Sequence, residues 1–319
     1  MAEVDVVIVN WNSGAFLSRC VDSLLIHGGA DLAKVFLVDN GSTDGSMGFV
    51  AGPSDQVEKV FLGTNAGFAK ACNRGAEKGR APYILFFNPD AELHPDCLRR
   101  SLDFMNSPAA AQVGICGVQL IGDDGQVEKT CARFPSVRTF MGRATGLHKV
   151  LPGVFPPHYL TDFDHRESRP VDEVMGAYFL VRRELFERLG GFDERYFVYF
   201  EELDFALQAR QAGWGTYFLA TASAYHKGGG VSSQVKAHRL FYSLRSRMLY
   251  SFKHMGRVRG GLVWLITMGL EPITRTVLAL ARCSRADVRN TWSGYRMLWA
   301  DMPATLRTAW QMGRAHGST

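Results

Sequence analysis

The sequence lacks the signatures of several common protein classes. Its six cysteines form no C-x-x-C pair and show no zinc-like spacing, so we expect reduced cysteines, several of them in the core, in a cytosolic protein. The N-terminus opens directly into a strand-like segment without a basic region, so no signal peptide is expected. No uninterrupted apolar run reaches the roughly 18–20 residues of a membrane span. These absences predict a cytoplasmic protein that is soluble or bound only peripherally to a membrane.

Two classes of nucleotide-binding enzyme are also disfavoured. A nicotinamide-dependent dehydrogenase would carry G-x-G-x-x-G after its first strand, and this chain has none there. A sugar nucleotidyltransferase would carry a glycine-rich loop with a basic residue at the same place. This chain instead reads Asn10-Trp11-Asn12-Ser13-Gly14.

Basic residues are concentrated at the C-terminal end of the 319-residue chain. The overall net charge is +5, but residues 236–319 hold 14 Lys and Arg against 3 acidic residues, and the preceding residues are net negative. We therefore expect a catalytic domain over residues 1–235 and a basic, amphipathic helical extension over 236–319. Such an extension suits an anionic surface such as phospholipid or a lipid diphosphate. Packing on the catalytic domain or on a second subunit would produce the same amphipathic pattern.

Strand-like and helix-like segments alternate through the first third of the chain. This alternation predicts right-handed βαβ units and a mostly parallel sheet of the α/β class. Polar clusters follow three of the strands, and such sheets bind ligands at the carboxyl ends of their strands. The pattern weakens between residues 132 and 172, which predicts a long irregular loop. The apolar segments that we expect to be strands include residues 4–9, 35–38, 57–62, 83–87 and 174–181.

The densest group of acidic residues follows an aromatic run. Glu201, Glu202 and Asp204 come directly after Tyr196-Phe197-Val198-Tyr199-Phe200, at the start of a predicted helix. Carboxylates crowded next to apolar residues are costly unless a cation, a proton or a reacting hydroxyl uses them. They would also suit a helix N-terminus, where negative charge interacts favourably with the macrodipole. A second acidic motif, Phe87-Asn88-Pro89-Asp90 at the end of an apolar strand, favours the functional interpretation.

Several motifs occur in the order in which family 2 glycosyltransferases carry them. They read VIVNWN at residues 7–12, VDNGSTDGS at 38–46, NAGF and NRG within 65–75, FNPD at 87–90 and GGFDE at 190–194, followed by the acidic cluster and His226. The chain resembles this family over about residues 4–232. The resemblance implies a GT-A fold and inverting transfer of a sugar from a nucleotide diphosphate. The Asn-Pro-Asp form and the aromatic approach to the acidic cluster are most similar to the bacterial rhamnosyltransferase branch.

The resemblance assigns seven residues to the nucleotide. A carboxylate or amide at a strand end, where backbone groups are free, suits the ribose and the base. Gly67 would let the backbone approach the ligand, and the free N–H groups of a helix N-terminus favour anions. Asp39 could equally belong to a plain turn, and Asn65 could be a simple helix cap. The assigned residues are Asn10, Asn12, Asp39, Asn65, Gly67, Asn73 and Asn88.

Asp90 is assigned to a divalent metal ion, Mn²⁺ or Mg²⁺. A sugar nucleotide leaves as a diphosphate, and a cation held by hard oxygen ligands stabilises the charge that develops. The family's usual motif is Asp-x-Asp, whereas this chain has Asn88 in the first position. The resemblance gives His226 as the second protein ligand and places Lys227 near the phosphates. A histidine taken alone is more often structural than a ligand.

The acidic cluster would supply the base that an inverting displacement needs to remove the proton of the acceptor hydroxyl. Alignment with the family's Glu-Asp pair gives Glu202 this position, with Glu201 as the second candidate. Gly176 and Ala177, in the strand before the cluster, are expected to let the donor sugar lie close to the backbone. Two carboxylates could also flank the scissile bond of a glycosidase, although no other motif favours that reaction.

These expectations describe a metal-dependent glycosyltransferase of cell-surface polysaccharide synthesis at the cytoplasmic face of the membrane. The resemblance favours dTDP-rhamnose as donor, with a UDP-sugar as the alternative, and a saccharide or polyprenyl-diphosphate-linked saccharide as acceptor. No nucleic-acid partner is expected, and the C-terminal helices would make either a peripheral membrane contact or a homo-oligomer. At two positions the chain departs from the family's pattern, with Asn88 in place of an aspartate and Glu202 in place of the more usual aspartate. These departures leave a second class open, a nucleotide-sugar-binding scaffold without activity.

Overall fold

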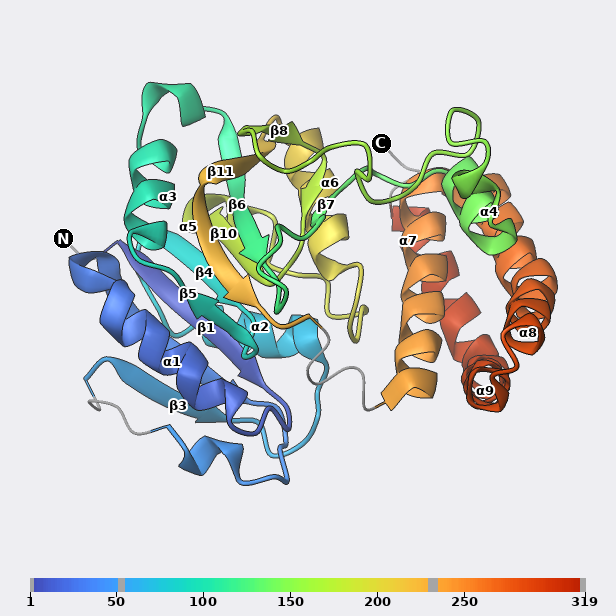
Figure 1. Ribbon diagram of the computed structural model, residues 1–319, viewed down its shortest axis with the longest axis horizontal. Coiled ribbons are helices and arrows are strands. Elements are labelled where there is room, and N and C mark those ends of the chain that lie inside the picture. The colour runs from blue at the N-terminus through green and yellow to red at the C-terminus, as the bar shows by residue number, and fades with distance from the viewer. Residues whose placement is uncertain (1–2, 51–54, 229–234, 316–319) are drawn as a thin grey trace. The chain divides into compact units, whose positions relative to one another are not determined.

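The computed structural model describes residues 3–50, 55–228 and 235–315, and the chain divides into two compact units (Figure 1). The first unit comprises residues 1–133, 159–194 and 201–231. The second comprises residues 134–158, 195–200 and 232–319. The second unit thus includes two short segments that precede residue 236, and the domain boundary at residue 235 stays a prediction.

A nine-stranded sheet forms the centre of the first unit. In spatial order its strands are β3 (Val57–Phe61), β2 (Leu32–Asp39), β1 (Val4–Asn10), β4 (Tyr83–Phe87), β10 (Tyr178–Arg182), β6 (Val113–Ile121), β11 (Gly215–His226) and β5 (Ala91–Leu93), with β8 (Arg169–Val171) paired to β11. The pairings among β3, β2, β1 and β4 are parallel, as is that of β6 with β11. Strand β10 runs antiparallel to both of its neighbours. The α/β class is confirmed, and the sheet is mixed because β10 is antiparallel to its neighbours and β5 and β8 are antiparallel to β11.

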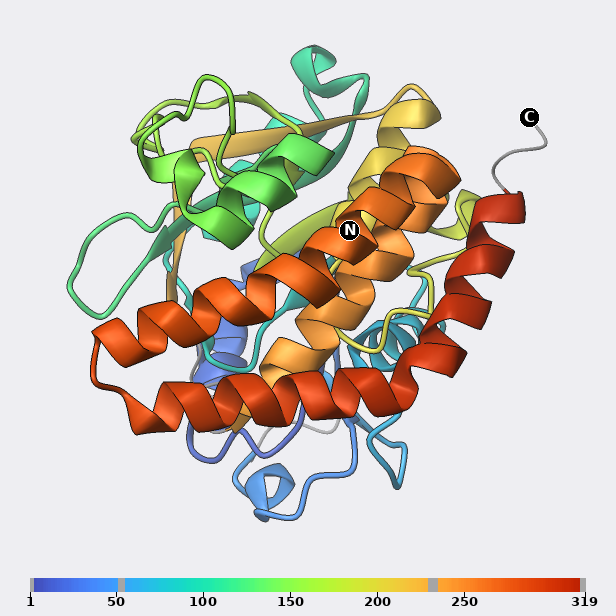
Figure 2. The ribbon, with the colours of Figure 1, turned by 90° about the vertical axis from the view of Figure 1, so that its right-hand side faces the viewer.

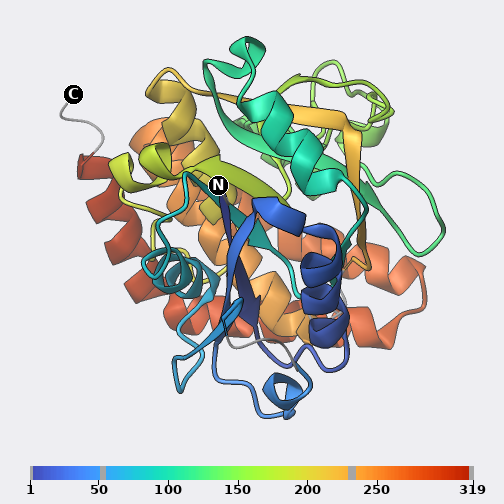
Figure 3. The same cartoon turned by 90° about the vertical axis from the view of Figure 1, so that its left-hand side faces the viewer.

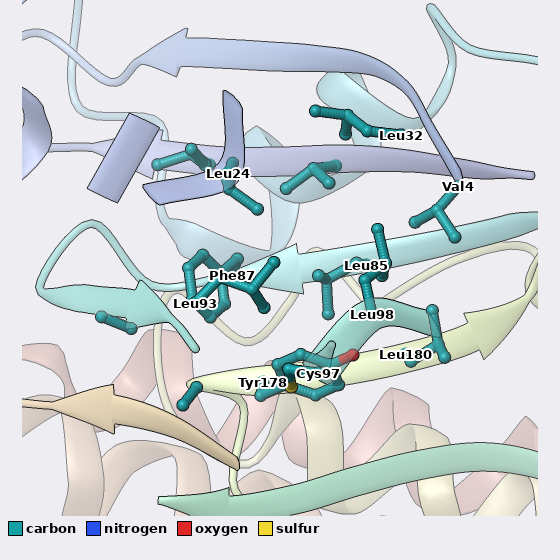
Figure 4. Packing of buried hydrophobic residues seen from close by; sticks show 14 of the residues in the cluster. Val4, Leu24, Leu32, Leu85, Phe87, Leu93, Cys97, Leu98, Tyr178 and Leu180 are labelled. Carbon is teal, nitrogen blue, oxygen red and sulfur yellow. The ribbon is translucent and has the colours of Figure 1, made fainter. Parts of the chain in front are cut away.

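Helices cover both faces of this sheet (Figures 1 and 3). Helices α1 (Phe16–His27) and α3 (Cys97–Met105) lie on one face, where Leu24 and Leu98 join the aliphatic core shown in Figure 4. The opposite face carries α2 (Phe68–Ala76), α5 (Arg183–Arg188) and α6 (Glu201–Gln211). A cluster of phenylalanines packs there, at positions 86, 179, 186, 192 and 205. Successive strand residues point to opposite faces, so continuous apolar strands bury both sides.

Two predicted elements differ from the structure. The strand expected over residues 174–181 is interrupted, because β9 (Glu173–Val174) pairs with β7 (Cys131–Ala132) and the main sheet resumes only at β10. The irregular loop expected over residues 132–172 contains α4 (Val137–Thr145) and a short strand, β8. A capping box explains the start of α4, since Ser136 and Thr139 each bond the other's backbone N–H.

The second unit is a helical assembly (Figure 2). Helix α7 (Lys236–Leu265) packs against α9 (Arg285–Ala315) around Leu244, Met248, Tyr295 and Leu298. A π-helical segment, Ile266–Leu270, joins α7 to α8 (Glu271–Ala281). Pro303 lies inside α9, where its ring cannot continue regular helical hydrogen bonding. Among the described residues, the stretch Lys236–Ala281 is long and apolar enough to cross a membrane, a weak indication based on length and composition.

A buried ion pair anchors α5 to the first strand of the sheet. The Arg183 Nη2 atom lies 2.8 Å from Asp5 Oδ2, and the same guanidinium donates to the carbonyl oxygens of Ala81 and Ala76. The Ala81 N–H also donates to Asp5 Oδ2, at 2.8 Å. Both charged residues are less than 10% exposed. Each charge is therefore balanced and hydrogen-bonded, which is the condition for burying it.

We predict that Asp5→Ala lowers the free energy of unfolding by about 3–5 kcal/mol, because it leaves the Arg183 guanidinium buried without its counter-ion. Urea denaturation measures this change. Asp103→Ala is the matched control, since its pair with Arg99 at 3.7 Å is exposed and should contribute at most about 0.5 kcal/mol. Equal losses in the two variants would contradict the prediction.

Candidate functional site

Polar side chains hold the loops at the carboxyl ends of β1 and β2. The buried Asn10 amide donates to Asp39 Oδ1 at 3.2 Å and to the hydroxyls of Ser42 and Ser46, at 3.0 and 2.8 Å. Asn12 Oδ1 accepts from the Thr43 N–H at 2.8 Å. Asn10, Asn12 and Asp39, predicted to bind the nucleotide, thus lie together at one edge of the sheet. Asn10 and Asn12 also shape the loop that presents the Asp39 carboxylate.

Asn40 directly follows β2 and connects the end of this strand to the start of α2. Its Nδ2 donates to Asn65 Oδ1 at 3.0 Å, and its Oδ1 accepts from the Ala66 N–H at 2.8 Å. The helix cap suggested for Asn65 is wrong, because α2 begins at Phe68 and Gly67 occupies the cap position. Gly67 has φ of +92°, a conformation that side chains rarely adopt. Gly67 therefore lets this loop turn into the helix beside Asp39 and Asn40.

Asn73 bridges α2 to the loop that follows α5. Its amide donates to the Phe192 carbonyl oxygen at 2.8 Å and to Glu194 Oε1 at 3.2 Å, and it accepts from the Phe192 N–H at 2.9 Å. A Cβ at Gly191 would lie 2.7 Å from Asn73 Oδ1, so only glycine allows this approach. The side chain of Asn73 is hydrogen-bonded to protein groups of this loop. Any effect of Asn73 on a nucleotide would therefore act through the position of the loop.

Asp90 and His226 meet where β11 ends beside β5. The Asp90 Oδ1 and His226 Nε2 atoms are 3.6 Å apart, and both residues are at least nine-tenths buried. The other ring nitrogen of His226, Nδ1, lies 3.2 Å from Glu128 Oε2. Burial alone would lower the pKa of His226, but its interactions with the carboxylates of Asp90 and Glu128 prevail and raise that pKa to about 9. Glu128 therefore holds the ring with Nε2 turned toward Asp90.

Glu128 lies on a hairpin that also binds the residues flanking His226. Asp123, at the start of the hairpin, accepts from Lys227 Nζ at 2.8 Å and from the Tyr225 hydroxyl. Three consecutive residues of the β11 end are thus held by two carboxylates of one loop. Sequence reasoning missed both, because Asp123 and Glu128 stand in a polar turn with no motif. Lys227, predicted to bind phosphate, has Asp123 as its partner here.

The residues at this edge can hold a cation only with help from a ligand. Among residues 3–50, 55–228 and 235–315, no group of three or more His, Cys, Asp or Glu side chains could hold a metal ion. Asp90 and His226 nevertheless present one oxygen and one nitrogen atom to the same space. Mg²⁺ and similar ions in phosphate-transfer sites are often bound by one or two protein side chains plus substrate phosphates. The pair fits a metal ion of that kind.

The start of α6 carries the acidic cluster. Glu201 is 2% exposed. Glu202 is half-buried, but its Oε2 atom is buried and has no hydrogen-bond partner among the described residues. The two carboxyl groups are hydrogen-bonded to each other, and the Gly176 N–H donates to Glu202. Burial raises the pKa of Glu202, and these hydrogen bonds only partly oppose that shift. A carboxylate with a raised pKa is suited to accept a proton near neutral pH.

The backbone directly before α6 is unusual. Tyr199 and Phe200 have φ values of +69° and +73°. Side chains other than glycine seldom adopt this left-handed conformation, and each such residue costs on the order of 1 kcal/mol. Tyr199 and Phe200 therefore form a strained turn directly before the first residue of α6.

A short hydrogen-bonded path joins the acidic cluster to the strand end that carries Asp90. The Asn88 N–H donates to the Ala177 carbonyl oxygen at 3.2 Å. Ala177 follows Gly176, whose N–H binds Glu202. A Cβ at Gly176 would lie 3.0 Å from Glu202 Oε1, so glycine permits this approach. The structure therefore brings Asn88, Gly176, Ala177 and Glu202 together.

A third glutamate, Glu173 on β9, belongs to the same acidic region. It is 8% exposed, and burial together with the charges of Glu202 and Asp172 raises its pKa well above the usual range. Burial and the charges of Glu201 and Glu202 likewise raise the pKa of Cys72 on α2. Sequence reasoning missed Glu173 because it precedes an apolar strand by one residue and looks like a strand end. The charge of Glu202 thus adds to the cost of ionising both Glu173 and Cys72.

Comparison with known proteins identifies the family. Residues 5–190 match glycosyl transferase family 2, which is more than half of the chain. The chain belongs to this family. An N-acetylglucosaminyl-diphospho-decaprenol L-rhamnosyltransferase of Mycobacterium tuberculosis is 30% identical over 82% of this chain and 88% of its own length. The rhamnosyltransferase WbbL of Escherichia coli is 28% identical over 45% of this chain and 52% of its own length.

Solved structures support the GT-A fold of this family 2 glycosyltransferase. A mannosyltransferase from Pyrobaculum calidifontis in complex with GDP-Man and Mn²⁺ aligns with a TM-score of 0.54, covering 98% of this chain and 86% of its own, at 17% identity. GalNAc-T7 with UDP, GalNAc and Mn²⁺ aligns with a TM-score of 0.57 over 79% of this chain, at 16% identity. This chain spans about half of GalNAc-T7, 48% of that chain.

The acidic cluster should destabilise this glycosyltransferase at alkaline pH. The pKa of Glu202 is raised in the folded state, so the folded protein holds this proton more tightly than the unfolded chain does. Stability is therefore lost as the pH rises above the ordinary pKa of a glutamate. We predict that Glu202→Gln has a higher unfolding temperature than wild type at about pH 8, and that this advantage shrinks toward about pH 5. Calorimetry checks this. Glu184→Gln, an exposed change on α5, should show no such pH-dependent gain.

Proposed function

We propose that this glycosyltransferase transfers a sugar, with inversion, from a nucleotide diphosphate to a saccharide or lipid-linked saccharide. The favoured donor is dTDP-rhamnose, with a UDP-sugar as the alternative. Two similar proteins bear rhamnosyltransferase names, and one of them is named for a decaprenol-linked acceptor. Both similar solved structures are named with a nucleotide or nucleotide sugar and Mn²⁺. The proposal adds a donor, an acceptor class and catalytic competence to the family assignment.

The observation that carries this proposal is the path from Asn88 through Ala177 and Gly176 to Glu202. It joins a proton-accepting carboxylate to the strand end whose Asp90 faces His226. A transferase needs both functions, one at the attacking hydroxyl and one at the leaving diphosphate, on either side of the anomeric carbon. The backbone of Gly176 and Ala177 lies between them, where the donor sugar is proposed to bind.

In this mechanism Glu202 accepts the proton of the acceptor hydroxyl. As that oxygen forms a bond to the anomeric carbon, the bond from the carbon to the diphosphate oxygen breaks, and the configuration inverts. Glu201 shares a hydrogen bond with Glu202 and is the second candidate for the base. The nucleotide would lie along Asn10, Asn12, Asp39, Asn65 and Gly67, at the strand ends described above.

Asp90 Oδ1 and His226 Nε2 would hold the divalent ion, Mn²⁺ or Mg²⁺. When bound, that cation stabilises the negative charge of the leaving diphosphate. Glu128 accepts a hydrogen bond from His226 Nδ1, as carboxylates commonly do for metal-binding histidines. Because the pKa of His226 is about 9 without the ion, Nε2 would lose its proton when the ion binds. Lys227 would exchange Asp123 for a phosphate oxygen. Asn88, standing where the family has a carboxylate, leaves Asp90 as the acidic ligand.

We propose that the second unit makes a peripheral contact at the cytoplasmic face of the membrane. Helix α8 exposes Ile273, Val277 and Leu280, each at least 60% accessible. Apolar side chains flanked by arginines are typical of helices that lie in a membrane interface. A second copy of the chain is the alternative occupant of this surface.

We predict metal-dependent binding of one nucleotide when the protein is titrated with dTDP, UDP and GDP by calorimetry. In the presence of Mn²⁺ or Mg²⁺ the favoured nucleotide, dTDP, should bind, and a chelator should weaken that binding. Asp90→Ala should reduce affinity about tenfold or more, because it removes the acidic metal ligand. Asp124→Ala, an exposed change on the neighbouring hairpin, is the control.

Each other outcome changes the proposal in a defined way. Binding that is indifferent to metal would remove the roles of Asp90 and His226 while keeping a nucleotide site. Preference for UDP or GDP would change the donor. Failure to bind any of the three nucleotides would contradict the transferase proposal and favour the scaffold without activity.

We further predict that Glu202→Gln retains nucleotide binding but lowers the turnover number for transfer by about 10²–10⁴-fold, the usual contribution of a general base. Radiolabelled-donor transfer assays measure turnover, and calorimetry measures binding in the same preparation. Glu201→Gln is the matched variant, because it alters the neighbouring carboxyl on the same helix. A larger loss in Glu201→Gln would assign the base to Glu201, and undiminished transfer in both variants would contradict the mechanism.

A further inference from the structure

A cavity of about 540 Å³ lies within the second unit, apart from the residues assigned to transfer. It is formed by the first turn of α7 and one face of α9. The polar residues that line it are His238, Arg289, Asn290, Ser293 and Arg296. All of its polar lining groups are basic or neutral, so the cavity has the composition of a site for an anion.

The two arginines of this cavity carry charge that the surrounding residues leave uncompensated. Ion pairs in this unit engage Arg245, Arg247 and Arg275 with Asp301 and Glu271. Among the described residues, Arg289 and Arg296 take part in no ion pair.

Helix geometry keeps the remaining acid away from them. Arg289 and Arg296 are seven residues apart, so both lie on nearly the same face of α9. Asp287 lies about 200° around the helix from Arg289. Two like charges share one face at a cavity, an arrangement that an anion would stabilise.

An aromatic stripe runs beside these arginines. Trp292 and Trp299 each follow an arginine by three residues, which places them about 60° around the helix. They are 42% and 45% exposed, and their rings lie 5.8 Å apart. Exposed tryptophans next to arginines are typical of the boundary between lipid headgroups and acyl chains, where an amphipathic ring contacts both. A free phosphate would leave this apolar stripe in water.

We propose that the α7–α9 cavity binds the phosphate of an anionic membrane-lipid headgroup, with Arg289 and Arg296 as its ligands and Trp292 and Trp299 against the lipid. The inference goes beyond the transfer site and assigns the basic extension a specific headgroup contact. It draws on the proposed function only for the expectation that a lipid surface is nearby. Arginine suits this role because its planar guanidinium binds phosphate oxygens through two parallel hydrogen bonds.

The test compares two variants with the same change of charge. Arg289→Glu/Arg296→Glu reverses the charge at the cavity, whereas Arg259→Glu/Arg307→Glu reverses two exposed arginines of the same unit that do not line it. Full-length proteins are sedimented with vesicles of phosphatidylcholine alone or with phosphatidylglycerol added. We expect the cavity variant to lose about tenfold or more of its affinity for anionic vesicles, and the control variant much less.

Three results would overturn the proposal. Equal losses in both variants would show diffuse attraction by the basic extension. Equal binding of wild type to neutral and anionic vesicles would show that the site does not select an anionic headgroup over the zwitterionic headgroup of phosphatidylcholine. Displacement of the protein from anionic vesicles by inorganic diphosphate at about micromolar concentration, absent in the cavity variant, would show a site for a soluble anion instead.

The same preparations separate this inference from the proposed function. Circular dichroism and thermal unfolding verify that the surface variants fold. Metal-dependent nucleotide binding should be unchanged in both variants, because none of their substitutions lies at the strand ends of the first unit. Loss of vesicle binding with intact nucleotide binding supports the headgroup site, whatever the donor proves to be.

Discussion

The candidate site depends on the direction of one strand, β10, which is antiparallel to both of its neighbours in a mixed sheet. Strand β10 enters the sheet between β4 and β6, and its first residues therefore lie beside the end of β4. Had β10 run parallel, its opposite end would face Asn88. The antiparallel direction instead brings Gly176 and Ala177 to the carboxyl edge, and with them the hydrogen bond to Glu202. The direction of one strand thus decides whether Glu202 is connected to Asn88 and the strand end that carries Asp90.

The buried carboxyl groups of the site are stabilised in two different ways. Asp90 faces a histidine that a second carboxylate orients, so the local charges alternate in sign. Glu201 and Glu202 share a hydrogen bond, and burial raises the pKa of Glu202. The first arrangement suits the binding of a cation and an anionic ligand. The second suits a group that must gain and lose a proton.

Much of this architecture could be predicted from the sequence, because strands, helices and the turns after them leave local patterns. The edge that gathers Asn10, Asp39 and Asp90 follows from strand alternation alone. The direction of β10 could not be predicted, since apolar content is the same in either direction. Glu128 and Asp123 were missed for a related reason. Their partners are about 100 residues away in the chain, and no local pattern encodes a contact at that separation.

The left-handed residues Tyr199 and Phe200 combine backbone strain with restricted conformational freedom directly before α6. Glycine at either position would relieve backbone strain, yet it would also allow the entry to α6 to adopt many directions. The two aromatic residues restrict the backbone conformations of this turn, and their positive φ values raise the energy of the folded state. A substitution that relieves this strain would therefore also loosen the start of α6, so that local stability and local order oppose each other at these two positions.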